Sequence, residues 1–119
     1  MERTKLDLIR GTLDVLILKA LAWGPQHGYA ITGFIRAWSD AALLVEEGTL
    51  YPALWRLERR QFVEAEWGLS ENNRKAKFYR LTTTGRRHLR DESRIWTAYA
   101  AAVAKVLGAT APAPAGKPL

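Results

Sequence analysis

Cationic side chains are the residues of this sequence best suited to chemistry, and their distribution suggests binding. The 119-residue chain carries 18 lysines and arginines against 12 acidic residues, a formal net charge of +6. Such a surplus attracts polyanions, and nucleic acid is the commonest polyanion inside a cell. The first helical region and the tail are nearly neutral, so the charge is concentrated in the middle of the chain. The residues of this basic region are Arg56, Arg59, Arg60, Arg74, Lys75, Lys77, Arg80, Arg86, Arg87 and Arg90.

Residue types that enzymes and metal sites need are scarce or badly spaced. There is no cysteine, and the two histidines, His27 and His88, do not stand at metal-ligand spacing. No nucleophile elbow, phosphate-binding loop, zinc-binding helix motif or plausible acid pair occurs. We therefore predict no metal, no cofactor and no enzyme activity. No apolar run approaches the roughly 20 residues that span a bilayer, and no secretory signal is recognisable, so we expect a cytoplasmic protein without membrane contact.

Residues 47–58 form the most informative segment. Leu50, Leu54 and Leu57 recur at helical spacing and define an apolar stripe. An acidic residue and a glycine suit the start of this helix, and a proline is tolerated within about the first turn. The pattern fits an ordinary amphipathic helix, or a helix that packs on a core while facing nucleic acid. The side opposite the leucines carries Thr49, Tyr51, Trp55, Arg56 and Arg59.

A hairpin pattern follows directly. Residues 62–67 alternate between apolar and acidic side chains, residues 68–73 are rich in turn formers, and residues 74–81 return as a strand with a basic start. A helix followed by a basic hairpin, or wing, predicts a winged helix whose helix enters the major groove while the wing reaches the adjacent backbone or minor groove. The candidate DNA-binding residues are Thr49, Tyr51, Pro52, Trp55, Arg56, Arg59, Arg74, Lys75 and Lys77.

The remaining elements complete a mainly α fold. We expect a first helix over residues 6–23, which Gly24 and Pro25 end, and a second from His27 to about residue 38. His27 is interpreted as a helix-start residue. Tyr29 is expected to fill the core because tyrosine is often buried with its hydroxyl satisfied.

A long final helix is expected over residues 85–107. A hydroxyl from residues 82–84 would cap its start, and Gly108 suits its end. This divides the chain into a winged-helix domain (residues 1–82) with a two-stranded wing, a dimerisation helix (83–108) and a tail (109–119). The tail has three prolines and is expected to be disordered.

The final helix carries an apolar seam that needs a partner. Leu89, Trp96 and Val103 repeat every seven residues, Tyr99 and Val106 fall on the adjoining heptad position, and an acidic residue at 92 interrupts the seam. A second copy of the chain is the simplest partner, so a homodimer is expected. The alternative is that this helix packs back on its own domain.

The motifs identify a family resemblance that covers roughly residues 6–107. The segments RGTLD (10–14), GPQHGYAI (24–31), GTLYPAL (48–54) and KFYRLT (77–82), followed by Gly85, resemble those of PadR-like transcriptional regulators. The resemblance implies a winged-helix repressor that binds an inverted-repeat operator in double-stranded DNA and is released by a small-molecule effector or a stress signal. The single C-terminal helix is similar to that of the shorter subfamily, which forms dimers through it.

The same resemblance bears on Trp96. Some short relatives accept flat aromatic compounds between tryptophans at the dimer centre, and Trp96 falls where such a tryptophan would be expected. Its alternative role is a plain hydrophobic anchor. An alternative for the whole chain is a winged-helix module that binds proteins and has lost DNA binding, against which the basic helix and wing argue.

Overall fold

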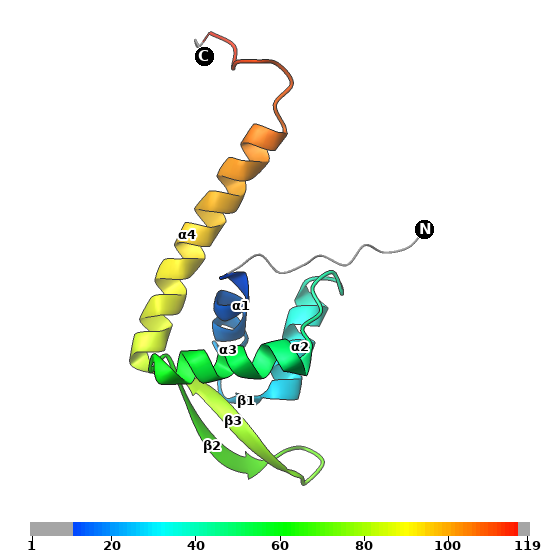
Figure 1. Cartoon of the computed structure of the whole chain (residues 1–119), viewed down its shortest axis with the longest axis vertical. Coiled ribbons are helices and arrows are strands. Elements are labelled where there is room, and N and C mark those ends of the chain that lie inside the picture. The colour runs from blue at the N-terminus through cyan, green and yellow to red at the C-terminus, as the bar shows by residue number, and fades with distance from the viewer. Residues whose placement is uncertain (1–10, 117–119) are drawn as a thin grey trace.

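The computed structural model describes residues 11–116 and confirms a mainly α, winged-helix fold (Figure 1). Three helices enclose the core, a small sheet lies at one end, and a fourth helix extends away from them. The elements in chain order are α1 (Thr12–Ala20), β1 (Gln26–His27), α2 (Gly28–Trp38), α3 (Glu47–Arg59), β2 (Val63–Leu69), β3 (Lys75–Leu81) and α4 (Thr83–Leu107).

The core lies between α1, α2 and α3. Each helix contributes one apolar stripe, because residues three and four positions apart share a helix face. The leucines predicted to form the α3 stripe, Leu50, Leu54 and Leu57, are all fully buried. Ile17 of α1 and Ile31 of α2 meet them in the same cluster. This burial fixes which side of α3 remains exposed.

The sheet has three strands in the order β1–β3–β2, all antiparallel, where the sequence predicted only the hairpin of β2 and β3. The additional strand, β1, consists of two residues, with Gln26 opposite Tyr79 and His27 opposite Phe78. A strand this short has no periodicity to detect. It ties the base of the wing (β2, β3 and the turn between them, residues 63–81) to the start of α2.

The first two helices differ in part from expectation. Within the described residues α1 begins at Thr12 and ends at Ala20, three residues before the predicted end, while the expected residues 6–10 lie outside the described range. The prediction for His27 is confirmed, because its Nδ1 accepts a hydrogen bond of 3.2 Å from the backbone N–H of Ala30 and so caps α2.

The prediction for Tyr29 is wrong. Its side chain is 84% exposed. The buried residues of α2 are Gly28, Ile31 and Ile35, so the face of α2 that packs on the core is not the one that carries Tyr29. Tyr29, one position after Gly28, points about 100° away from that residue around the helix. Core packing therefore does not account for the aromatic residue at position 29 of the 24–31 motif.

The start of α4 is part of the core. The hydroxyl of Thr82 accepts a bond from the Gly85 N–H at 2.9 Å and donates one to the Gln61 carbonyl at 2.7 Å, which joins α4 to the segment before β2. Leu89 was placed in the dimer seam, but it is only 9% exposed and belongs to the chain's own core cluster. This corrects its predicted role, because its side chain is covered by its own domain.

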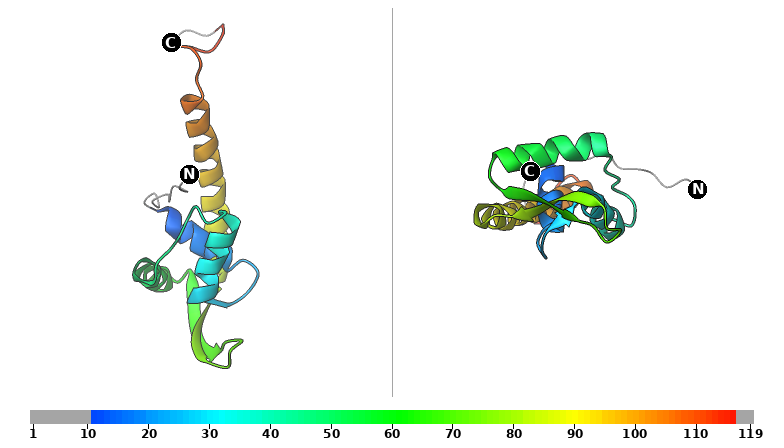
Figure 2. Two further views of the ribbon diagram at one scale, coloured as in Figure 1. Left: turned by 90° about the vertical axis from the view of Figure 1, so that its right-hand side faces the viewer. Right: turned by 90° about the horizontal axis from the view of Figure 1, so that it is seen from below.

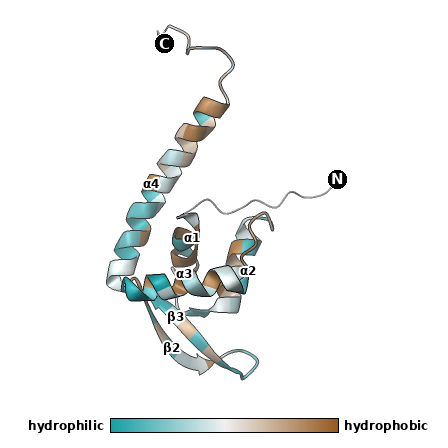
Figure 3. Cartoon of the chain, in the orientation of Figure 1, coloured by the Kyte–Doolittle hydropathy of each residue, from teal (hydrophilic) through white to brown (hydrophobic). Residues whose placement is uncertain are grey.

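Beyond this base, α4 leaves the domain. Figure 2 shows it extending past the other elements, and Figure 3 shows that it becomes more hydrophobic toward its C-terminal end. Residues 109–116 form neither helix nor strand, and the last three residues lie outside the described range. None of the helices in residues 11–116 has the length and apolar content of a membrane-spanning segment.

Candidate nucleic-acid interface

The exposed side of α3 is the first part of the candidate interface. Burial of the leucine stripe turns Thr49, Pro52, Trp55 and Arg59 toward solvent. The guanidinium of Arg59 lies 4.8 Å from the centre of the Trp55 ring. A cation over an indole is held in place without losing its charge, which suits binding to a phosphate or a base edge.

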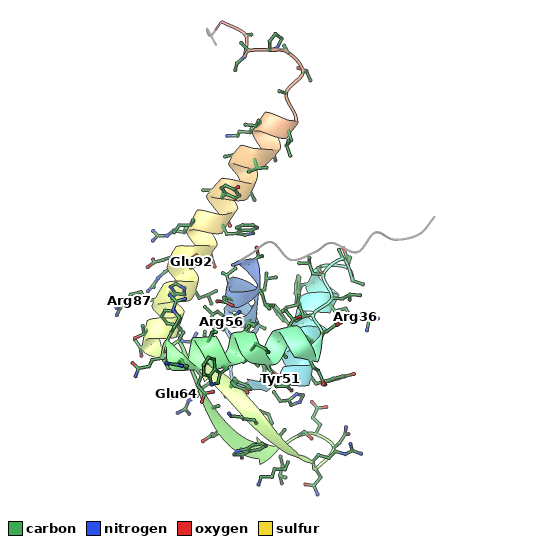
Figure 4. The ribbon with its side chains drawn as sticks, viewed as in Figure 1. Arg36, Tyr51, Arg56, Glu64, Arg87 and Glu92 are labelled. Atoms are coloured by element: carbon green, nitrogen blue, oxygen red, sulfur yellow. The ribbon has the colours of Figure 1, made fainter. Side chains whose placement is uncertain are left out.

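Tyr51 lies at the edge of α3 nearest the wing (Figure 4). A Cβ atom added to Gly28 would come within 2.6 Å of the Tyr51 hydroxyl. Glycine at position 28 therefore allows the phenol to approach the first turn of α2. The hydroxyl marks the point where α2, α3 and the wing converge.

Two of the predicted cations are paired with carboxylates of their own chain. Arg56 lies on the side of α3 that faces α1, where its Nη2 is 3.5 Å from Oδ1 of Asp14 (Figure 4). Lys77 Nζ is 3.8 Å from Oε1 of Glu58. All four side chains keep substantial exposure, so these pairs orient the cations more than they stabilise the fold.

The wing divides its charges between its two faces. The register places Trp67 opposite Lys77 on one face and Glu64 opposite Arg80 on the other. Arg80 donates to Oε2 of Glu64 from Nε at 3.1 Å and from Nη2 at 2.9 Å, which neutralises that face locally. The face with Trp67 keeps its charge, and Nζ of Lys75 lies 5.2 Å from the centre of the Trp67 ring.

A groove of about 910 Å³ runs between α2 and the wing, and we call it the α2–wing groove. Tyr79 lies at its floor, and burial, followed by the nearby Glu58 carboxylate and Tyr51, raises the pKa of its hydroxyl above the ordinary value. The phenol is therefore neutral at physiological pH and adds no negative charge beside the cations. The residues that line this groove include Tyr29, Tyr51, Trp67, Arg74, Lys75 and Lys77.

The structure thus separates the predicted residues into three groups. The α2–wing groove is lined by Tyr51, Arg74, Lys75 and Lys77. The exposed side of α3 carries Thr49, Pro52, Trp55 and Arg59. Arg56 is turned toward α1. The residues of the groove that sequence reasoning missed include Tyr29 and Trp67. The helical phase set by Ile31 and Ile35 could have identified Tyr29 as exposed.

The distal half of α4 carries a second exposed feature. Tyr99, Val103 and Val106 are exposed and, with Ala102 and Leu107, line an apolar groove of about 270 Å³. Trp96 is half-buried, and its ring centre lies 5.8 Å from that of Tyr99. Among the described residues, no group of three or more histidine, cysteine or acidic side chains could hold a metal ion.

Comparison with known proteins gives consistent matches. The model of the transcriptional regulator PadR-like family matches residues 17–91. A curated protein of Lysinibacillus sphaericus, named uncharacterized protein X, is 33% identical over 90 residues, or 76% of this chain and 83% of that protein.

Solved structures agree with the family match. A transcriptional regulator from Clostridium thermocellum is 31% identical, with a TM-score of 0.73 over 84% of this chain and 97% of that chain. A PadR family transcription regulator from Clostridium difficile R20291 is 28% identical, with a TM-score of 0.71 over 82% of this chain and 100% of that chain.

Proposed function

We propose a function from the premise that this chain belongs to the PadR-like family of transcriptional regulators, a family of regulators and not of enzymes. The chain binds double-stranded DNA of a specific sequence, with α3 in the major groove and the wing on the adjacent backbone or minor groove. The observation that carries this proposal is the position of α3 beside the groove. This helix exposes Trp55 and Arg59 on the side away from the core, and its Tyr51 lines the α2–wing groove together with Arg74 and Lys75.

The operator is an inverted repeat bound by a homodimer that represses transcription. The distal half of α4 supports the dimer, since its Tyr99, Val103 and Val106 form an exposed apolar surface. A second copy would bury this surface and place two α3 helices on half-sites about 34 Å apart, one turn of the duplex.

A small, flat aromatic compound releases the regulator from DNA. Trp96 supports this proposal, because its half-buried ring lies beside Tyr99 at the start of the apolar surface. A ligand that binds one arrangement of the dimer better than another shifts the population toward it. If Trp96 is only an anchor, Trp96→Phe will leave the response to every such compound unchanged.

The DNA-binding proposal is tested with the duplex upstream of the chain's own coding region. Fluorescence anisotropy should show much tighter binding to this duplex than to a scrambled duplex of equal composition, and footprinting should reveal two protected half-sites. Equal affinity for both duplexes would refute sequence specificity. Failure to bind any duplex would refute the function and favour a protein-interaction module. Transcription in vitro from the footprinted promoter then distinguishes repression from activation.

A further inference from the structure

The exposure of Tyr29 calls for an explanation outside the core. At 84% it is the most exposed of the large hydrophobic side chains recorded in residues 11–116. No hydrogen bond of its hydroxyl to another described residue is present. Large aromatic side chains at this exposure are typical of binding surfaces, where a ring supplies contact area and a hydroxyl supplies a polar end.

The backbone under Tyr29 is held firmly. Its carbonyl accepts a bond of 3.0 Å from the Thr32 hydroxyl, and the His27 ring, 6.4 Å away, caps α2 through Ala30. The His27 ring also meets the Phe78 ring of β3 edge-on at 5.4 Å. Tyr29 is therefore an exposed side chain on a capped and hydrogen-bonded helix start, which suits positioning of a partner.

The wall opposite Tyr29 is formed by the wing. Trp67 lies there beneath the Lys75 ammonium group, and Arg74 continues the same wall. Glu71 is the one carboxylate among the groove's lining residues, against Arg74, Lys75 and Lys77. The groove thus alternates aromatic rings with cations, and its net charge is positive.

A sugar–phosphate strand has the matching chemistry. Its phosphates accept bonds from ammonium, guanidinium and phenol groups, while its sugars offer apolar faces to aromatic rings. An acidic peptide would also meet the cations, but the groove is continuous through Tyr51 with the side of α3 proposed to face DNA. On the basis of the proposed function, we infer that one DNA backbone strand lies in the α2–wing groove and that the Tyr29 hydroxyl donates to one of its phosphates.

This assigns Tyr29 the role of a positioning residue. It adds one phosphate contact that helps to hold the duplex between α2 and the wing. Phosphate contacts carry no sequence information themselves, so loss of Tyr29 weakens binding to all sequences alike. The hydroxyl is neutral and displaces no counterion, so its loss leaves the dependence of affinity on salt unchanged.

The experiment compares Tyr29→Ala and Tyr29→Phe with Lys75→Gln. Affinity of the full chain is measured for the operator and for an unrelated duplex at several salt concentrations. Tyr29→Ala should weaken both affinities about tenfold with an unchanged slope of log K against log salt, and Tyr29→Phe should lie between it and the original chain. Lys75→Gln should lower that slope by about one unit.

Trp38→Ala is the matched control. Trp38 is the last residue of the same helix, is 79% exposed, and does not line the groove. It should bind DNA like the original chain. Ethylation interference then locates the contact. Ethylation of one particular phosphate should weaken binding of the original chain, and the same ethylation should no longer weaken binding of the Tyr29→Phe chain.

The possible failures are distinct. If the original chain binds no duplex, the proposed function and this inference both fail. If the original chain binds its operator and Tyr29→Ala binds equally well, only the inference fails. A Tyr29→Ala chain that loses discrimination between operator and unrelated DNA, or changes the salt slope, also contradicts a neutral backbone contact.

Discussion

Two glycines determine how closely separate elements approach one another. At Gly28 the missing side chain makes room for the Tyr51 hydroxyl, and at Gly85 it makes room for the backbone of residue 62. The second contact is the more demanding, because a Cβ atom on Gly85 would lie 1.9 Å from the Phe62 carbonyl oxygen. Backbone cannot swing away as a flexible side chain can, so the junction between α4 and the wing depends on this glycine.

Gly85→Ala should therefore destabilise the chain by roughly 3 kcal/mol or more, because either α4 or the segment before β2 must move. Gly33→Ala is the matched control, since Gly33 lies inside α2 with no atom within 4 Å of its missing Cβ. That change should stabilise by roughly 0.5–1 kcal/mol. Chemical denaturation measures both, and equal free energies of unfolding for the two variants would contradict the close contact.

Two cations of the candidate interface are paired with carboxylates of their own chain. Asp14 holds Arg56 on the side of α3 that faces α1, and Glu58 holds Lys77 near the base of the wing. Sequence reasoning counted Arg56 and Lys77 as equivalent to Lys75. It had no means of pairing residues that are 42 or 19 positions apart in the chain.

Asp14→Asn should strengthen binding to DNA of any sequence. The change removes a negative charge close to the interface and frees Arg56 for a phosphate, so the slope of log K against log salt should steepen by up to about one unit. Asp91→Asn is the control, because Asp91 pairs with Arg94 at 2.8 Å on α4. Unchanged affinity for Asp14→Asn would mean that Arg56 does not reach the DNA even when it is unpaired.

Among the elements, the wing is where the sequence was most informative about charge. The alternation of β2 and β3 predicted a hairpin with a basic start, and the register confirms the hairpin. The alternation did not reveal β1, because its two residues form a strand only through their pairing with β3. The leucine stripe of α3 was predictable because helical burial repeats within a few residues. The burial of Leu89 was not, since only the packed fold shows that the base of α4 lies against its own domain.

The two lysines of the wing should contribute unequally to DNA binding. Lys75 is exposed and stacks over Trp67, whereas Lys77 is paired with Glu58. Lys75→Gln should lower the salt slope by about one unit, and Lys77→Gln should lower it less, because part of that charge is already neutralised. Glu58→Gln provides the check, since it should make a subsequent Lys77→Gln change as costly as Lys75→Gln. Equal slopes for the two single lysine variants would show that the ion pair breaks on DNA binding.

At the scale of the whole molecule, the two halves of α4 lie in different surroundings. The side chain of Thr82 caps its first turn, and Leu89 is buried, so this half belongs to the winged-helix unit. Its distal half projects from that unit with an apolar surface at Tyr99, Val103 and Val106 (Figures 1 and 3). An exposed apolar surface on an isolated helix is unfavourable in water, so the elongated shape of one chain is itself an argument for assembly.

Truncation after Glu92 separates the two halves. The shortened chain keeps Thr82, Gly85 and Leu89, so it should stay folded, with an unfolding transition close to that of the full chain at high dilution. Light scattering should show a monomer. Its affinity for a single half-site should be nearly unchanged, but its affinity for the whole inverted repeat should fall by at least about 100-fold, because the second half-site is no longer bound at a high effective concentration.

Val103→Asp in the full chain is the matched variant, since it places a charge in the apolar surface without shortening α4. A truncated chain that remains dimeric would place the interface on the winged-helix unit, and a truncated chain that unfolds would show that the distal half also stabilises the monomer.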